Sequence, residues 1–525
     1  MTKKFTGMAA GFAVGFMAAL LIAIMAVSPK AAYAETYEKV RAQELTPKSP
    51  VFDYLYEKLM AKETDIDMSQ FNILLDENEK RADVEARSIY GGVLKEYADV
   101  SWSSTCTVEL RKEADGYYFQ KLNMTYVDEE YDMDAFYAAR DRALALLTPD
   151  MNDLQKALTL HDYLVATAAY DYSSVVNHEG RRNNHKAYGA LVEHLCVCEG
   201  FSLAYKYLCN QAGIECYYTD TALNQHAWNT VIIDGEAYEV DLTIDNPCWD
   251  ILGRVWHDGF MTSEAYLKEY YGTHDGDRHV NCYNKELDLH ATSTKYDDAF
   301  WKEVQAPILY YKDNFYYTVR QELPGTRIKS GIAKRPADLS GSQSVLHRIF
   351  AESAYEHYFW YDGYVLKVED DRIFFNTQTT FSSMDLDGND FRDEYVIDTG
   401  ENAIYGAAIL DGQIYYTLGK EWPQDVETYI PLSEEDRVYF PEPEVTAEPE
   451  PEVTEAPKVT EAPVVTEAPI VTEAPIVTEA PEKGSDDEEL DGFWQEDKLY
   501  ILMGCGILSI AAAAVVVIMR KGKKD

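Results

Sequence analysis

Two β-rich segments of this chain are joined by a two-residue turn, and that turn limits how the segments can pair. They run from Gln225 to Ile233 and from Glu236 to Leu242, and together they contain one Tyr, two Val and two Ile, residue types that favour strands. The turn residues, Asp234 and Gly235, are among the strongest short hairpin signals in protein sequences. The sequence therefore predicts an antiparallel hairpin in which Ile233 pairs with Glu236.

This register places a histidine and an aspartate on one face of the hairpin. Counting back from the turn, Trp228 pairs with Asp241 and His226 pairs with Thr243. Successive side chains point to opposite faces of a strand, so His226, Trp228 and Asp241 share a face. His226 and Asp241 become diagonal neighbours, about 7–8 Å apart at the backbone, within reach of a side-chain hydrogen bond. A one-residue bulge in either strand would separate them.

A helix is predicted upstream of the hairpin, from Cys198 to Ala212. Apolar residues recur there at spacings of three and four, and Gly213 is a typical C-terminal stop. The apolar stripe consists of Phe201, Ala204, Tyr205, Leu208 and Ala212. Cys198 falls in the first turn, where unpaired N–H groups and the helix dipole favour a thiolate. The same N–H groups suit the oxyanion of a tetrahedral intermediate.

Cys198, His226 and Asp241 together have the composition of a papain-type nucleophile system. In such a system the thiol attacks, the imidazole takes and returns the proton, and the carboxylate orients the imidazole. A single cysteine at a helix start is usually a small buried residue, and a single histidine on a strand usually belongs to the core. The combination predicts catalysis because an independently predicted turn brings two of the three residues together.

Several motifs in this part of the chain resemble the bacterial transglutaminase-like superfamily over about residues 147–256. They are His161-Asp162-Tyr163-Leu164, Tyr170-Asp171, Ala187-Tyr188-Gly189-Ala190-Leu191, Val197-Cys198-Glu199-Gly200-Phe201, Ala212-Gly213-Ile214, His226-Ala227-Trp228-Asn229 and Val240-Asp241-Leu242-Thr243. The resemblance implies a papain-like core with nucleophile Cys198 on a helix and base His226 and acid Asp241 on adjacent strands. The superfamily includes amide cross-linkers, proteases, amidases and inactive members, and the fold does not choose among them. His161 is expected to be a structural residue.

Cys196 departs from the pattern of these relatives and raises two other interpretations. His194, Cys196 and Cys198 are spaced by one residue each. Metal sites usually separate cysteines by two to four residues and add a second ligand pair, and the chain has no Cys-x-x-Cys. A redox role, in which an exposed Cys196 resolves an oxidised Cys198, is the stronger of the two. We expect no metal and no cofactor.

The fold class expected for the whole chain is α+β, with the papain-like transglutaminase core at its centre. The expected order is a signal peptide (1–34), a small α/β module (35–146), the transglutaminase-like domain (147–290), an all-β repeat domain (291–440), a disordered Pro/Thr/Glu-rich stalk (441–498), one transmembrane helix (499–519) and a cytoplasmic tail (520–525). The α/β module shows no chemistry of its own, and resembles the leader module of clostridial relatives.

The two ends of the chain predict export and membrane attachment. Lys3-Lys4 precede an apolar run that ends near an Ala32-Tyr33-Ala34 cleavage signal. From Leu499 to Met519 no residue is charged, which suffices for a membrane span. The basic residues that follow place the C-terminus in the cytoplasm. Val-Thr-Glu-Ala-Pro recurs five times between these regions, which favours an extended stalk. The expected location is a bacterial cell surface, Gram-positive in type.

Three stretches of the repeat domain share one pattern of strand, acidic turn and aromatic strand. They are Leu309–Tyr317, Val365–Phe375 and Ala408–Tyr416. The pattern predicts either a partial propeller or stacked hairpins. The aromatic side chains could bind polysaccharide or peptide, but cross-strand packing is favoured. A nearby acidic segment, Asp385 to Asp390, is predicted to be a turn because it lacks the spacing and the closing Glu of an EF-hand.

The formal net charge of −44 disfavours nucleic-acid binding, which needs a basic surface. Of the eight cysteines, Cys505 lies in the predicted span, and the pairing of Cys209, Cys216, Cys248 and Cys282 stays open. Oligomeric state also stays open. Two functions fit the sequence. One is an extracellular cysteine enzyme acting on amide bonds of protein or cell-wall peptide, by hydrolysis or by amine capture. The other is a non-catalytic adhesion protein on the same scaffold.

Overall fold

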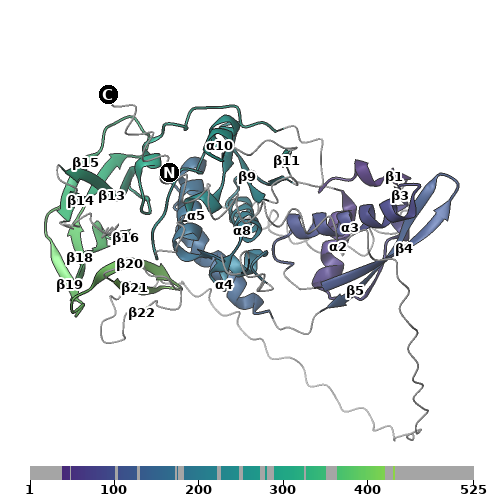
Figure 1. Ribbon diagram of the computed structural model, residues 1–525, viewed down its shortest axis with the longest axis horizontal. Coiled ribbons are helices and arrows are strands. Elements are labelled where there is room, and N and C mark those ends of the chain that lie inside the picture. Colours follow the sequence, from purple (N-terminus) through teal and green to yellow (C-terminus); the bar gives the residue numbers. More distant parts are fainter. Residues whose placement is uncertain are drawn as a thin grey trace, which may run out of the picture. The chain divides into compact units, whose positions relative to one another are not determined.

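The computed structural model describes residues 38–47, 49–100, 104–126, 131–171, 174, 183–221, 226–246, 252–271, 278–280, 289–323, 327–349, 363–419 and 430–431. The described residues up to Asp411 belong to one compact unit. They form a mixed α/β structure, with helices concentrated before residue 272 and strands after residue 308 (Figure 1). The expected signal peptide, stalk, membrane span and cytoplasmic tail lie outside the described residues. Within the described part, no helix is both long and apolar enough to cross a membrane.

The first part of the chain is an α/β module built on a five-stranded sheet of order β1-β3-β5-β2, in which β4 also pairs with β5. Its elements are β1 (Val40–Arg41), α2 (Pro50–Met60), β2 (Asp65–Asp67), β3 (Ile73–Leu75), α3 (Glu79–Glu96), β4 (Ser104–Glu113) and β5 (Gly116–Tyr126). Phe52, Ile89 and Phe119 are fully buried in its core. In the sequence, Tyr90-Gly91-Gly92 predicts an interruption of regular structure, but Gly91 lies within α3.

The central part contains the helices and the sheet that carry the predicted site residues. Its elements are α4 (Met133–Ala145), α5 (Asp153–Thr167), β6 (Ala169–Tyr170), α7 (Ala187–Leu191), β7 (Leu195–Cys196), α8 (Cys198–Gln211), β8 (Cys216–Thr221), β9 (His226–Ile233), β10 (Glu236–Val240), α9 (Leu242–Asp245), α10 (Glu264–Tyr271) and β11 (Arg278–Val280). The sheet has the antiparallel order β10-β9-β8-β11. Helix α8 packs against β8 and β9.

Helix α8 forms where the apolar spacing predicted it. Phe201, Ala204, Tyr205 and Leu208 are all buried, so the stripe is the face that contacts the core. The helix ends as expected at Gly213, whose φ of 81° is left-handed. A residue without a Cβ adopts this conformation at little cost.

The β9–β10 hairpin has the predicted turn and, near the turn, the predicted register. Asp234 and Gly235 have φ values of 54° and 79°, and Ile233 pairs with Glu236. The ladder ends where Val240 pairs with Asn229. Beyond it the expected pairing of Thr243 with His226 is wrong, because residues 242–245 form the short helix α9.

The last described part is all β and consists of three antiparallel sheets in chain order. Their strands are β12 (Leu309–Tyr311), β13 (Asn314–Leu323), β14 (Arg327–Pro336), β15 (Ser344–Ile349), β16 (Val365–Glu369), β17 (Arg372–Asn376), β18 (Thr380–Asp385), β19 (Arg392–Val396), β20 (Ala403–Leu410), β21 (Gln413–Gly419) and β22 (Ile430–Pro431). The 3-10 helix η4 (Phe300–Glu303) precedes them, and η2 (Ala42–Glu44) and η3 (Ser69–Phe71) lie in the first module.

Each of the three repeated stretches is a hairpin with a two-residue turn. The turn residues, Lys312-Asp313, Asp370-Asp371 and Asp411-Gly412, all have positive φ values between 46° and 78°. Two successive positive φ values are the signature of the type I′ turn, which suits the right-handed twist of paired strands. Several repeat aromatics, among them Tyr317 and Phe375, are buried, in agreement with the favoured packing role.

Candidate active site

His226 and Asp241 meet at the end of the β9–β10 hairpin. His226 Nε2 lies 2.7 Å from Asp241 Oδ2, the length of a charge-assisted hydrogen bond. Asp241 is completely buried, whereas 16% of the His226 side chain is exposed. The imidazole therefore has one nitrogen fixed by a buried carboxylate and an edge that solvent or a substrate can approach.

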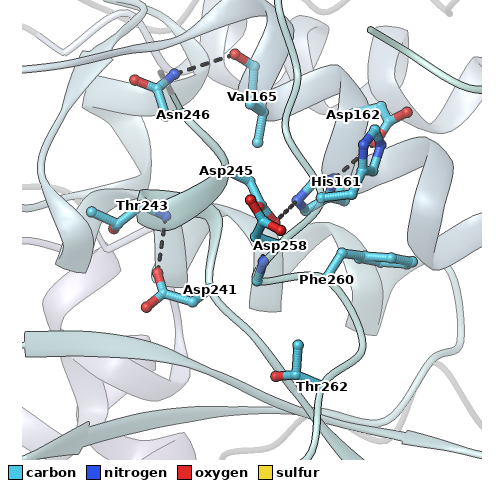
Figure 2. Close-up of polar contacts among 12 residues, drawn as sticks. His161, Asp162, Val165, Asp241, Thr243, Asp245, Asn246, Asp258, Phe260 and Thr262 are labelled. Carbon is cyan, nitrogen blue, oxygen red and sulfur yellow. Dashed lines mark hydrogen bonds and ion pairs between the residues drawn. The ribbon is translucent and has the colours of Figure 1, made fainter. Parts of the chain in front are cut away.

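Asp241 is oriented by backbone groups of α9 and of the segment that follows it. Its Oδ1 accepts a hydrogen bond from the N–H of Thr243 at 2.9 Å, the contact of an N-cap residue (Figure 2). Its own N–H donates to the carbonyl of Gly259 at 3.0 Å. With Oδ1 occupied in this way, Oδ2 is the oxygen that faces His226.

Cys198 is the first residue of α8 and contacts the same imidazole. Its thiol interacts with the imidazole and helps to raise the pKa of His226, while Asp241 holds Nε2 and leaves Nδ1 as the nitrogen for the thiol. The N-cap residue, Val197, has no side-chain hydrogen bond to the helix. The amides of the first turn are consequently not covered by a capping side chain and remain suitable donors for an oxyanion.

Gly200 allows a neighbouring turn to approach the start of α8. A Cβ at this position would lie 2.5 Å from the carbonyl oxygen of Asn184 and 2.7 Å from Cβ of Cys196. The Asn184 carbonyl also accepts the N–H of Val197 at 2.9 Å. Only glycine leaves room at position 200 for the Asn184 carbonyl, which in turn holds the backbone that leads into Cys198.

The electrostatics of the site favour a protonated His226. Burial alone lowers the pKa of this histidine, but the charge and hydrogen bond of Asp241 outweigh burial, and Cys198 adds to them. The net result raises the pKa of His226 well above its ordinary value of 6.5. The site thus stabilises the imidazolium that forms when the ring takes the proton of the thiol.

Trp228 packs against the imidazole of His226. The two ring centroids are 5.7 Å apart and the planes differ by 24°. The indole Nε1 donates to Oε2 of Glu239 at 2.6 Å, and Thr230 Oγ1 donates to the same oxygen at 3.1 Å. Glu239 and Trp228 are both buried, so this network holds the indole in one orientation against His226.

A second buried polar cluster lies near Asp241 and was not predicted as a unit. His161 contacts Asp162 on one side and Asp245 on the other (Figure 2). Burial lowers the pKa of His161, but these two carboxylates outweigh it and raise the pKa to about 9, so positive charge is favoured there. His257 contacts Asp162 as well, at 3.0 Å. The expectation that His161 is not catalytic agrees with its complete burial.

This cluster is linked to Asp241 through Gly259. The Gly259 N–H donates to Asp245 Oδ1 at 2.8 Å, while its carbonyl accepts the N–H of Asp241. Nearby, Lys302 Nζ donates to the carbonyls of Asp258 and Phe260, and burial lowers the pKa of this lysine to about 8. The signal for His161 was present in the His-Asp-Tyr-Leu motif, but nothing in the sequence indicated Asp245 or His257.

The structure supports neither the metal site nor the redox pair that Cys196 suggested. Cys196 is completely buried, and burial raises the pKa of its thiol well above 9, so it is not the exposed thiol that the redox interpretation requires. His194 Nε2 lies 3.6 Å from Asp411 Oδ2 and does not join Cys196 in any metal-type cluster of the described residues. Cys106, Cys196, Cys198, Cys209 and Cys216 are all free thiols.

Comparison with known proteins gives only distant likenesses. No protein-family model matches the chain, and a search of curated proteins finds no match. Among solved structures, one described as a TGase is 14% identical, covers 33% of this chain and 50% of its own, and has a TM-score of 0.19. A candidate cysteine protease from Cytophaga hutchinsonii is 16% identical, covers 27% and 64% of the two chains, and has a TM-score of 0.17.

A third solved structure is the β-propeller domain of the Trilobed protease from Pyrococcus furiosus. It is 13% identical, covers 42% of this chain and 80% of its own, and has a TM-score of 0.18. The chain spans about half the length of the first of these structures. At TM-scores this low the likenesses carry no weight for function, and the chemistry of the site rests on the geometry of Cys198, His226 and Asp241.

Proposed function

We propose that this protein is a cysteine-dependent enzyme that transfers the acyl group of an amide substrate through a thioester. The observation that supports the proposal is the continuous chain of contacts from the buried Asp241 carboxylate through His226 to the Cys198 thiol. The thiol partner and the partly exposed ring distinguish His226 from the fully buried His161.

In the proposed reaction, Cys198 passes its proton to His226 Nδ1 and its sulfur attacks the amide carbonyl. The first-turn amides of α8 bind the oxyanion of the tetrahedral intermediate. His226 then gives the proton to the leaving amine, and the acyl group remains on Cys198. Asp241 keeps its charge throughout and stabilises the imidazolium.

The molecule that accepts the acyl group from Cys198 decides between hydrolysis, with water, and cross-linking, with an amine. Water is present at high concentration, so hydrolysis is the default outcome unless the site excludes it. The partially exposed edge of His226 offers no such exclusion within the described residues. We therefore favour a protease or amidase acting on protein or cell-wall peptide over an amine cross-linker.

We further propose that the enzyme works outside the cell, held by a single C-terminal membrane span on an acidic stalk. The support is the sequence alone: the cleavage signal at Ala32-Tyr33-Ala34, the five Pro-containing repeats, and the uncharged run from Leu499 to Met519. Fractionation of cells that express the chain, with protease added to intact cells, tests this location.

The nucleophile is tested by alkylation of the full-length chain with iodoacetamide, read residue by residue by mass spectrometry. Cys198 should react first. Cys106 is an internal reference, because it is also partly exposed but contacts the Arg87 guanidinium, and burial raises the pKa of its thiol. Cys209 and Cys216 are buried and should react only on unfolding. Equal rates for Cys198 and Cys106 would indicate the non-catalytic scaffold instead.

The acyl acceptor is tested with casein, offered with or without a fluorescent primary amine. Peptide cleavage or ammonia release without the amine indicates hydrolysis, and fluorescence in casein indicates amine capture. Both must disappear in Cys198→Ala, while the circular dichroism spectrum of the variant stays unchanged.

A further inference from the structure

The buried side chains of His161, Asp162 and His257 converge on one point. All three residues are at most 3% exposed, and one ligand atom from each lies within 4.8 Å of the others. Asp162 Oδ1 is 2.8 Å from His161 Nδ1 and 3.0 Å from His257 Nε2, so both rings point at the same oxygen.

The remaining ring nitrogens also face acceptors. His161 Nε2 lies 3.0 Å from Asp245 Oδ2, and His257 Nδ1 lies 3.0 Å from the carbonyl oxygen of Val304. Each ring therefore directs one nitrogen at Asp162 Oδ1 and the other at an acceptor outside the cluster.

The two imidazole ring centroids are 5.5 Å apart, so both rings border the same small buried volume. A divalent cation at the point where the three side chains converge would offset the charge of the buried Asp162 carboxylate.

We propose that His161 Nδ1, Asp162 Oδ1 and His257 Nε2 bind a structural divalent transition-metal ion, of which zinc fits best. Two imidazole nitrogens and one carboxylate oxygen form a donor set that zinc prefers, with a water completing the tetrahedron. Metal-bound histidines usually donate their second N–H to a carboxylate or a backbone carbonyl. Asp245 and Val304 are those two acceptors here.

The surroundings show what such an ion would hold together. His161 and Asp162 belong to α5, His257 comes from the segment between α9 and α10, and Asp162 Oδ2 accepts the N–H of Ile308 at 2.7 Å. The ion would therefore fasten α5 to two segments that are distant in sequence. No spacing in the sequence indicates this site, because Asp162 and His257 are 95 residues apart.

The proposal is tested on the full-length chain carrying Cys198→Ala, so that zinc bound to the candidate nucleophile does not contribute. The protein is produced with zinc in the medium and desalted, and its metal content is measured by mass spectrometry. We expect about one zinc ion per chain. A chelator should lower the melting temperature, and added zinc should restore it.

Two variants localise the ion. His257→Gln should reduce the zinc content at least tenfold, whereas His290→Ala, which removes an exposed histidine bonded to Glu264, should leave it unchanged. If His257→Gln does not fold, cobalt in the parent chain replaces this test, since tetrahedral binding to two nitrogens gives an intense visible spectrum. A parent chain that holds no zinc after incubation and shows no zinc-dependent melting overturns the proposal. Equal zinc content in His257→Gln overturns it too.

Discussion

Replacing Asp241 by asparagine should disable the site while leaving its shape intact. The N–H of Thr243 donates to Oδ1 of Asp241 at 2.9 Å, so the amide oxygen of the variant takes that position. Its NH₂ group then faces His226 Nε2, where the wild-type distance is 2.7 Å. Because NH₂ donates and cannot accept, the single ring proton of neutral His226 moves to Nδ1, the nitrogen that must receive the thiol proton.

A base held in the wrong tautomer typically loses about 10³- to 10⁴-fold in turnover, or roughly 4–5.5 kcal/mol of transition-state stabilisation. Alkylation of Cys198 by iodoacetamide reports the same defect without a substrate. An ordinary thiol is ionised in roughly one molecule of 300 at about pH 6. Loss of the base should therefore lower the alkylation rate constant there by up to about 10²-fold, with the difference closing toward about pH 9.

Asp234→Asn is the matched control for this prediction. It removes a carboxylate from the same hairpin, but at the exposed turn, where asparagine also accepts a positive φ. Its alkylation profile should match that of the wild type. If Asp241→Asn also alkylates Cys198 at the wild-type rate across the whole pH range, Asp241 does not act through His226 and the reasoning fails.

The same ion pair predicts a pH-dependent stability, because the pKa of His226 is raised in the folded chain. The stabilisation by protonated His226 is complete below about pH 6.5 and is lost as pH rises through the raised pKa. In urea unfolding, the free energy of unfolding should therefore differ more between wild type and Asp241→Asn at low pH than at high pH. Gly200→Ala should destabilise the fold by about 1–3 kcal/mol, because the new Cβ meets the Asn184 carbonyl at 2.5 Å. Gly91→Ala has nothing within 4 Å and should stabilise α3 by about 0.5–1 kcal/mol in the same assay. Trp228→Phe should cost about 1.5–3 kcal/mol by leaving the buried Glu239 carboxylate without the indole donor, and near-ultraviolet circular dichroism would detect the accompanying loosening around His226.

Local patterns predicted much of the fold because their causes are local. The apolar stripe of α8, its stop at Gly213 and the Asp234-Gly235 turn each depend on residues within a few positions of one another. The three repeated hairpins follow the same rule, since an acidic or glycine residue at each turn accepts a positive φ. Gly91 was misjudged because burial of neighbouring residues in α3 outweighs the low helix propensity of glycine.

The hairpin register predicted that the side chains of His226 and Asp241 come into contact, and the structure confirms that contact. It did not predict how Asp241 is held. Asp241 leaves the ladder, caps α9 and donates its N–H to Gly259, because the segment after α9 folds back against it. A strand pattern read along the sequence cannot include a partner supplied by a later segment.

The sequence by itself predicted the candidate nucleophile, base and acid and their order, and it determined the turn that brings the candidate base and acid together. Only the tertiary structure decided which oxygen of Asp241 faces the imidazole, that Cys196 is buried, and that His161, Asp162 and His257 converge on one point. The physical reason is the sequence separation of the residues that interact. Turns and amphipathic stripes depend on residues that are close in the chain, whereas burial and side-chain convergence depend on packing between distant segments.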